Sequence, residues 1–453
     1  MGKYGGISLS IIFHSSLLII LPLLVPTYLA LHTPDFICLP NPPLPVKLSV
    51  PFSTCSDSVK RSLAQRHPDQ NKNTPEILKT YGYPFRTYNI TTKDGYILTV
   101  YRITGSPKLA KKSKKGGTQA VYLNHGLGGA SDTWNFQPDS RNLPFKLADA
   151  GYEVWLGNCR GSTYSLGHTK YNANINIIRY WDFSFHEMGI YDVPAVTDKI
   201  LSETNTSKIF YIGHSMGTTQ YFVSLSELPE MNNKIEAGFL MAPIAYMGHM
   251  NNGLRLVAPL LATDAQYHVV NMALLGRIQS AQQFRQYFKI SLGDLCDLTA
   301  TKCGLCDNLI FLLFGYDAAQ MNNTELPNMF AKVPNNIGVK CVAHYTQNIL
   351  TCRFQKYDYG IFRNIIEYGS MWAPEYDLQN VEAPTYLFYA EQDNLGPPND
   401  VEITARKLKS GVLKGKFKVK NKLFNHADFI IAKDADKLVY NKILAEMKKY
   451  KAH

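Results

Sequence analysis

The sequence predicts an α/β fold in which helices cover both faces of a mostly parallel β-sheet. Short apolar stretches typical of buried strands alternate with longer stretches typical of helices, over residues 74–243 and again over 373–453. Between them, residues 244–372 carry mostly helical apolar patterning, several glycines and three clustered cysteines. We therefore expect one α/β core in two parts, with a mainly helical cap inserted between them.

The N-terminal stretch has the order of a secretory leader. Lys3 precedes an apolar run from Ile11 to Val25, which is interrupted by proline and is short for a membrane span. We expect a signal peptide over residues 1–30, with an uncleaved anchor as the alternative, and a proline-rich, disordered leader over residues 31–73. The signal peptide predicts the secretory pathway, with an extracellular or lysosomal destination.

Three Asn-x-Ser/Thr triplets fit that route as candidate glycosylation sites. Their asparagines are Asn89, Asn205 and Asn322. The eight cysteines can also pair in an oxidising compartment, and Cys296, Cys303 and Cys306 lie close enough for one small-loop disulfide. The spacing of Cys303 and Cys306 resembles that of zinc ligands, but no second pair follows at the distance of a zinc finger, so we expect no metal.

The net charge of +11 owes much to two lysine clusters, and neither demands a nucleic-acid partner. Residues 108–115 lie among glycine, serine and proline, which is typical of a solvated loop. In residues 414–422 lysines alternate with Phe417 and Val419, which predicts a strand with one solvent-exposed face. Such a strand fits the edge of a sheet, where the lysine charges prevent pairing with another strand. Weak attraction to an anionic lipid surface is the alternative.

Capping and turn signals begin the ordered part of the chain. Thr74-Pro75-Glu76 predicts a helix start, with the Thr74 hydroxyl as N-cap and proline at the first helical position. Lys93-Asp94-Gly95 predicts a hairpin turn between strands at 85–91 and 96–102. The other predicted strands are 120–123, 153–156, 209–212, 385–389 and 417–423. The other predicted helices are 143–150, 193–203, 401–408 and 435–448.

Ser215 is the candidate nucleophile, in Gly213-His214-Ser215-Met216-Gly217 between a predicted strand and a helix-compatible run. The backbone of a serine in such a turn is strained and the chain doubles back, so the positions two before and two after it must lack side chains. A tight turn with an incidental serine is the alternative. The surrounding parallel sheet favours the catalytic interpretation.

A serine nucleophile requires a histidine base, and the imidazole requires a carboxylate that fixes its tautomer. Asp393 follows the strand at 385–389, and His426 follows the last predicted strand, in the order Ser, acid, His. Three other carboxylates compete for the role of the acid. They are Asp377, Asp400 and Asp428.

The tetrahedral intermediate of ester hydrolysis requires two N–H donors. The backbone N–H of Met216, just past the serine, is one by geometry. The loop Asn124–Gly129 follows the strand at 120–123, and its glycines let the backbone approach a substrate, so the N–H of Leu127 is the second candidate. An ordinary glycine turn is the alternative, and we expect His125 and His214 to pack and bond rather than act as bases.

These features resemble the acid lipase family of α/β-hydrolases, which includes lysosomal acid lipase and gastric lipase, over about residues 74–450. The matching stretches are Tyr81–Pro84, Asp94–Leu98, His125–Leu127, Leu147–Asn158, Arg160–Gly161, Phe183–Met188, Tyr191–Asp192, Gly213–Ser215, Gly217–Thr219 and His426–Phe429. The resemblance implies an α/β-hydrolase fold, with Ser215, Asp393 and His426 as the triad. It also implies Leu127 and Met216 as oxyanion donors, and a cap with a movable lid over an apolar acyl pocket.

The resemblance further implies hydrolysis of triacylglycerols or sterol esters without a cofactor, and we expect a monomer that meets neutral lipid at a lipid–water interface. A disulfide between Cys296 and Cys306 is implied, although Cys303 leaves the pairing open. Two positions depart from the family: Met216 replaces a frequent glutamine, which leaves the backbone donor intact, and Cys159 replaces a small residue. A carboxylesterase for short soluble esters and a non-catalytic lipid-binding homologue are the alternatives.

Overall fold

The computed structural model of the chain describes residues 68–109, 119–137, 141–288, 314–315, 317, 319–322 and 324–452. The predicted signal peptide, most of the predicted leader, and Cys296, Cys303 and Cys306 lie outside these residues. At the end of the predicted leader, residues 68–71 form a turn in which Asp69 and Gln70 are buried. The described residues contain no helix whose length and hydropathy would let it span a bilayer.

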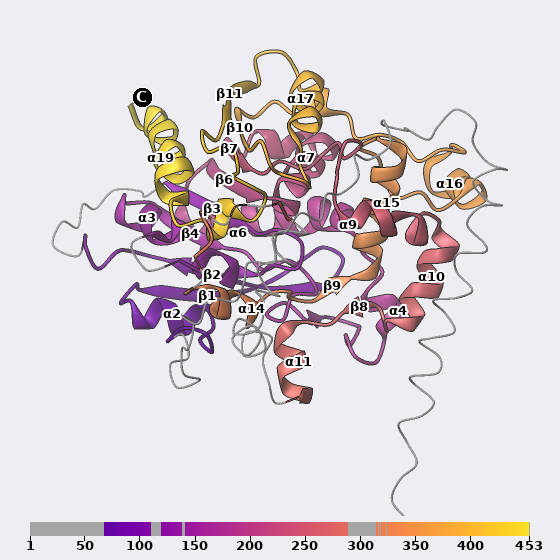
Figure 1. The fold of residues 1–453 in the computed structure, drawn as a ribbon, viewed down its shortest axis with the longest axis horizontal. Coiled ribbons are helices and arrows are strands. Elements are labelled where there is room, and N and C mark those ends of the chain that lie inside the picture. The colour runs from indigo at the N-terminus through magenta and orange to yellow at the C-terminus, as the bar shows by residue number, and fades with distance from the viewer. Residues whose placement is uncertain are drawn as a thin grey trace, which may run out of the picture.

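The centre of the fold is a nine-stranded sheet in the order β1-β2-β4-β3-β6-β7-β10-β11, with β5 paired to β2 (Figure 1). The pairs β1–β2, β2–β4 and β2–β5 are antiparallel, and all the other pairs are parallel. The strands are β1 (Phe85–Thr91), β2 (Tyr96–Ile103), β3 (Ala120–Asn124), β4 (Glu153–Leu156), β5 (Gly167–His168), β6 (Ile209–His214), β7 (Ile235–Met241), β10 (Thr385–Tyr389) and β11 (Leu413–Lys418).

Helices cover both faces of this sheet, because successive strand residues point to opposite faces and each face is apolar. One core contains Ala120 and Tyr122 of β3 and is covered by α6, α7 and α17. The other contains Val121 and Leu123 of the same strand and is covered by α2, α3 and α19. These helices are α2 (Thr74–Thr80), α3 (Leu143–Asp149), α6 (Val193–Thr204), α7 (Met216–Glu227), α17 (Pro398–Lys407) and α19 (Asn441–Lys448).

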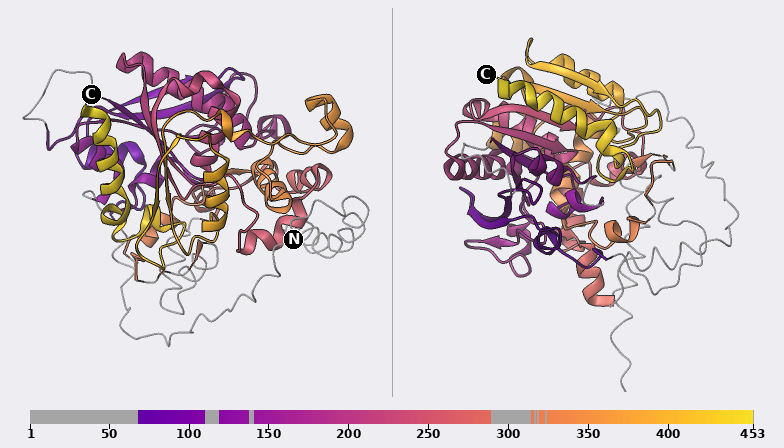
Figure 2. Two further views of the ribbon diagram at one scale, coloured as in Figure 1. Left: turned by 90° about the horizontal axis from the view of Figure 1, so that it is seen from above. Right: turned by 90° about the vertical axis from the view of Figure 1, so that its left-hand side faces the viewer.

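Between β7 and β10 the chain leaves the sheet and forms mostly helices. In Figure 1 and the left panel of Figure 2, α10 and α16 lie on the side of the molecule away from α19. The described elements here are α9 (Gly253–Val257), η4 (Ala258–Leu261), α10 (Asp264–Ala273), β8 (Arg277–Ile278), α11 (Ala281–Phe288), α14 (Leu326–Phe330), β9 (Ile337–Gly338), α15 (Val339–Thr351) and α16 (Ile361–Tyr368). The two short strands β8 and β9 form a separate antiparallel pair.

Short helical turns complete the described chain. They are η1 (Ser131–Asn135), α4 (Ile177–Tyr180), α5 (Phe185–Glu187), η3 (Met188–Asp192), α8 (Pro229–Asn232), η5 (Leu378–Asn380), α18 (Asp428–Ile431), η6 (Asp436–Tyr440) and η7 (Lys449–Ala452).

The α/β fold predicted from the sequence is confirmed, with three local differences. The sequence did not predict β7, whose nearly continuous apolar run is buried and has no strand-like alternation. The N-cap of α2 is Asn73, which shares a capping box with Glu76, because the Thr74 hydroxyl is buried and bonds Asp132 Oδ1 at 2.7 Å. The last strand lies at Leu413–Lys418 rather than 417–423, because its partner β10 ends at Tyr389, opposite Lys418.

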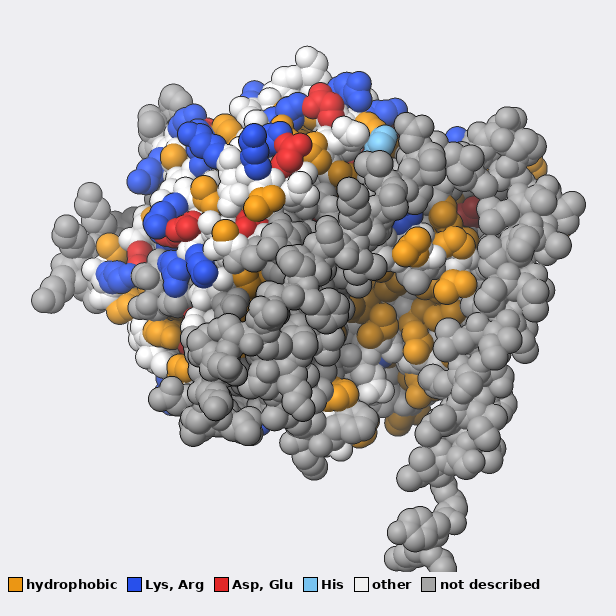
Figure 3. All heavy atoms as spheres, in the orientation of Figure 1, with side chains coloured by type: hydrophobic (Ala, Val, Ile, Leu, Met, Phe, Trp, Pro, Cys, Tyr) orange, Lys and Arg blue, Asp and Glu red, His pale blue; other side chains and the backbone are white. Residues whose placement is uncertain are grey.

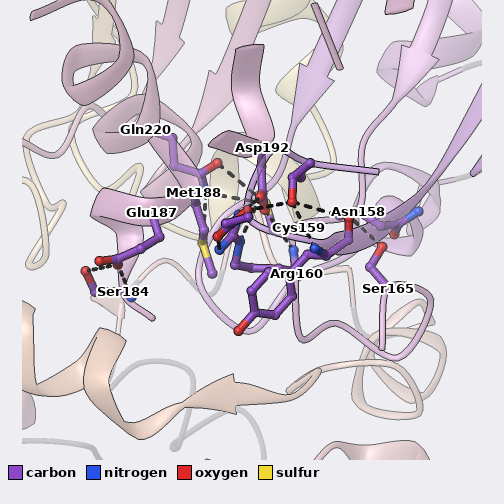
Figure 4. Close-up of polar contacts among 12 residues, drawn as sticks. Asn158, Cys159, Arg160, Ser165, Ser184, Glu187, Met188, Asp192 and Gln220 are labelled. Carbon is purple, nitrogen blue, oxygen red and sulfur yellow. Dashed lines mark hydrogen bonds and ion pairs between the residues drawn. The ribbon is translucent and has the colours of Figure 1, made fainter. Parts of the chain in front are cut away.

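A buried ion network ties the hairpin turn to the loop after β4. The Arg160 side chain has no exposed surface, and its Nε lies 2.7 Å from Asp192 Oδ1 (Figure 4). Its Nη1 lies 2.5 Å from Asp94 Oδ2 in the hairpin turn, and the guanidinium stacks 4.0 Å from the Tyr96 ring centre. Charges this deeply buried are tolerated only because each is paired.

We expect Arg160→Met to lower the free energy of unfolding by about 3–5 kcal/mol, because it leaves the Asp192 carboxylate buried without its cation. Adding Asp192→Asn should recover part of that loss. Urea unfolding followed by circular dichroism measures both. The exposed pair of Lys409 with Glu382 provides the control, since Lys409→Ala should cost less than about 1 kcal/mol. A buried variant that costs no more than this control would contradict the assignment.

Candidate active site

Ser215 occupies a strained turn between β6 and α7. Its φ of 52° and ψ of −120° are unfavourable for a residue with a side chain. The turn is possible because Gly213 and Gly217 flank it: a Cβ on Gly217 would lie 2.2 Å from the Asn124 carbonyl oxygen, and one on Gly213 would lie 2.9 Å from the backbone of Gly217. Ser215 is partly exposed, whereas both flanking residues are buried.

Asp393 and His426 lie together although 33 residues separate them. Both Asp393 carboxylate oxygens are 2.9 Å from His426 Nδ1, and both side chains are almost fully buried. The N–H groups of Leu395 and Gly396 also donate to Asp393 Oδ1, which fixes the carboxylate. Because Nδ1 faces a carboxylate, Nε2 is the nitrogen free to accept a proton, and it has no hydrogen-bond partner among the described residues.

The other carboxylates considered for the acid contact different groups. Asp400 bonds His249 Nδ1 at 2.7 Å, and Asp377 caps the turn η5. Asp428 Oδ2 accepts the N–H of Asn425. Among these carboxylates in the described chain, only Asp393 bonds the His426 ring.

The elbow is linked directly to the loop that carries His426. His214 Nε2 lies 3.1 Å from the backbone oxygen of His426, and a carbonyl only accepts, so this nitrogen carries the proton. Burial, with a smaller contribution from nearby His426, lowers the pKa of His214 to about 3. His214 is thus a neutral residue that holds the loop carrying His426, and it packs and bonds as expected from the sequence.

The loop after β3 forms a tight turn beside Ser215. The Gly129 N–H donates to the Gly126 oxygen at 3.0 Å, and Gly128 has a φ of +67°, which favours glycine. His125 Nδ1 lies 2.9 Å from the same oxygen, while its Nε2 accepts the Cys159 N–H at 3.1 Å. Burial lowers the pKa of His125 to about 4, so the ring stays neutral and donates through Nδ1.

The backbone N–H groups of the two candidate oxyanion donors have no hydrogen-bond acceptor among the described residues. Leu127 follows Gly126 across a trans peptide, so its N–H points away from the Gly126 oxygen. That oxygen accepts the two hydrogen bonds described above, from Gly129 and His125. Met216 is the first residue of α7, where an N–H has no partner within the helix. Neither N–H donates to another described residue. A Cβ on Gly126 would lie 3.0 Å from Ser215 Cβ, which shows how close the loop and the elbow are.

A small cavity adjoins this site on the side of the segment between β7 and β10. Its lining includes Leu127, Met188, Met216, Ile337 and Cys341. The Cys341 sulfur lies 3.6 Å from that of Met216, and burial raises the pKa of this thiol, so it behaves as a small apolar group. The sequence carried no signal for this contact.

The remaining predicted residues are placed as follows. Asn89 and Asn205 are exposed, whereas Asn322 is only 8% exposed and its side-chain oxygen accepts from Thr324. Cys159 is free and buried, as expected, while Cys352, which the sequence did not single out, is disulfide-bonded. The described part of the chain holds no group of three or more acidic, histidine or cysteine side chains suited to a metal ion.

Asp428 is a titratable group two residues after His426, in the same loop. The side chain is fully buried, and its Oδ1 has no hydrogen-bond partner among the described residues. Burial, with smaller contributions from the carboxylates of Asp317 and Asp393, raises the pKa of Asp428 to about 8. The folded protein therefore holds a neutral Asp428 across a range in which the unfolded chain ionises it.

The contribution of Asp428 to stability should be complete below about pH 4 and should fall as the pH rises to about 8, because there only the unfolded state releases the proton. We expect this group to lower the free energy of unfolding by up to about 4 kcal/mol between pH 5 and 8. Asp428→Asn, which cannot ionise, should flatten that slope. Urea unfolding at both pH values tests this, and equal slopes in the two proteins would refute it.

Comparisons with known proteins agree with this geometry. Residues 119–432 match the α/β-hydrolase fold family, and residues 74–137 match the partial α/β-hydrolase lipase region. Lipase 3 of Drosophila melanogaster is 36% identical, over 83% of this chain and 92% of that protein. Gastric triacylglycerol lipase of Bos taurus is 34% identical over 84% and 92%, and lipase lipl-1 of Caenorhabditis elegans is 33% identical over 83% and 91%. The chain therefore belongs to the acid lipase family of α/β-hydrolases.

Proposed function

We propose that this carboxylic ester hydrolase is a serine lipase that cleaves neutral lipids, triacylglycerols and sterol esters, through an acyl-enzyme on Ser215. The observation that carries the proposal is the buried pair of Asp393 with His426 Nδ1, which leaves Nε2 without a described partner. The strained elbow, bonded to the loop that carries His426 through His214, supports it.

In the first half-reaction, His426 Nε2 takes the Ser215 proton as Oγ attacks the ester carbonyl, and Asp393 stabilises the imidazolium that forms. The N–H groups of Leu127 and Met216 bind the oxyanion. Collapse of the intermediate breaks the C–O bond to the alcohol, which leaves with the proton held by His426. Water then repeats the sequence on the acyl-enzyme, releases the fatty acid and restores Ser215.

The lipid part of the proposal draws on relatives and on the segment that we assign as the cap, residues 244–372. Several relatives are named as lipases, among them gastric triacylglycerol lipases, and the cap contributes Ile337 and Cys341 to the small cavity beside Met216.

We propose residues 74–243 and 373–453 as the hydrolase core. We also propose that the protein is a monomer routed through the secretory pathway to an extracellular or lysosomal site, with Asn89 and Asn205 as glycan acceptors.

Helix α16 of the cap exposes apolar side chains and buries a polar one, the opposite of a helix that faces only water. Phe362 is 88% exposed and Ile366 is 81% exposed, whereas the polar Asn364 is buried and bonds Asp358. A second set of exposed apolar side chains gathers over α4, α10 and β8 (Figure 3). Apolar surface of this kind favours contact with a lipid–water interface.

A carboxylesterase for short soluble esters would use the same triad, and it remains the second candidate. The exposed apolar face of α16 favours a lipase, because a soluble ester requires no such surface. Rates on emulsified triacylglycerol, sterol esters and short esters, measured from acidic to neutral pH, separate the two activities.

Ser215→Ala should lower esterase activity by at least about a thousandfold and abolish labelling by a fluorophosphonate, because the nucleophile is removed. The labelled peptide, identified by mass spectrometry, should contain Ser215. Ser224→Ala provides the matched control, since this buried serine of α7 should not affect labelling. Full esterase activity in folded Ser215→Ala protein would refute the proposal.

Replacing Phe362 and Ile366 together by serine should lower the rate on emulsified triacylglycerol by about tenfold or more, because two apolar anchors are lost. The rate on a soluble short ester should not change, since neither side chain belongs to the triad. Lys448→Ser, an exposed change on α19, controls for general surface effects. Equal losses on both substrates would contradict a role in lipid contact.

A further inference from the structure

Three peptide groups beside the elbow form a chain of hydrogen bonds that ends at Leu127. The Asn335 N–H donates to the Gly128 oxygen at 2.6 Å, and the Gly129 N–H of that same peptide donates to the Gly126 oxygen at 3.0 Å. The Gly126 oxygen shares its peptide with the Leu127 N–H. Because these peptides are trans, each N–H points away from its own carbonyl. The three hydrogen-bond donors therefore point in the same direction along the chain of hydrogen bonds.

Such a chain makes its last donor stronger. A carbonyl that accepts a hydrogen bond polarises its own peptide, and the N–H of that peptide becomes a better donor, by an estimated 10–30% per bond. Leu127 N–H is at the open end of the chain, where the proposed oxyanion forms. Asn335 is at the other end, and it comes from the cap rather than from the hydrolase core.

The side chain of Asn335 holds the first donor in place. It is 1% exposed, its Oδ1 accepts the Thr163 N–H at 2.8 Å, and its Nδ2 donates to Thr163 Oγ1 at 3.0 Å. Thr163 lies in the loop after β4 that also carries Arg160. Two residues further on, Ile337 packs against the turn, since a Cβ on Gly128 would lie 2.9 Å from Ile337 Cδ1.

We propose that Asn335 is a positioning residue of the oxyanion hole, through which the cap aligns and polarises the Leu127 N–H. This inference rests on the proposed function, because it assumes that Leu127 donates to the oxyanion. It assigns the cap a part in the chemical step in addition to substrate contact. Among the described residues, Asn335 forms no hydrogen bond with Ser215 or His426. It acts only through the peptide groups of the turn after β3.

The test uses a soluble short ester and a trifluoromethyl ketone, whose tetrahedral adduct places an oxyanion in the same position. Asn335→Ala should lower kcat by about tenfold or more while KM changes less than about twofold, since only the transition state carries the oxyanion. The Ki of the ketone should rise by the same factor. Active sites are counted by fluorophosphonate titration, so that a loss of folded protein is not read as a loss of rate.

Thr163 supplies a milder pair of variants that keeps the test decisive if Asn335→Ala folds poorly. Thr163→Val removes the hydroxyl that accepts from Asn335 Nδ2 at nearly constant shape, and should lower kcat and raise Ki together by a few fold. Thr163→Ser keeps the hydroxyl and should restore both values. A loss of mere packing would not be rescued in this way.

Asn232→Ala is the matched control, because Asn232 is also a buried asparagine that joins two segments, by accepting from Glu382 and donating to the Asn380 oxygen. It should lower Tm without changing kcat or Ki. The inference is wrong if the wild type is active and the Asn335 and Thr163 variants raise KM alone or leave kcat and Ki unchanged. An inactive, unlabelled wild type would instead refute the proposed function.

Discussion

The close approach of Gly217 to the Asn124 carbonyl is the constraint on which the site depends. With a side chain at position 217 the first turn of α7 could not lie against the end of β3, since a Cβ would be 2.2 Å from that oxygen. This contact brings the elbow and the turn after β3 together. The unfavourable φ of Ser215 costs of order 1–3 kcal/mol, which the buried β6 and α7 around it offset.

Two histidines next to the site are structural, and burial keeps both of them neutral. His125 donates to the Gly126 oxygen and His214 donates to the His426 oxygen, so each orients a loop that carries a proposed catalytic group. Burial lowers both pKa values, to about 4 and about 3, and neither ring gains a proton in mildly acidic water. The two loops therefore keep their hydrogen bonds across the acidic range in which Asp428 is also neutral.

Local patterns in the sequence predicted most of the core, and they failed where the decisive contact is distant. The hairpin at Asp94 and the elbow at Ser215 follow from neighbouring residues, and both lie where the sequence predicted them. β7 was missed because a strand buried on both faces shows no alternation. The sequence offered four carboxylates for the acid, and only the folded chain shows which one meets His426. The bond of Asn335 to Gly128 joins backbone atoms, so side-chain chemistry gave no signal for it.

The segment between β7 and β10 is attached to the core at two points that matter for the site. Near its start, the Asn251 N–H donates to the oxygen of Asn394, the residue after Asp393. Further along, the Asn335 N–H donates to Gly128 in the turn that contains Leu127. Both attachments are backbone bonds, so the side chains elsewhere on the segment can change without loss of either bond. A segment held in this way can vary the surface that it offers to a substrate while the loop that carries Asp393 and the turn beside Ser215 keep their geometry.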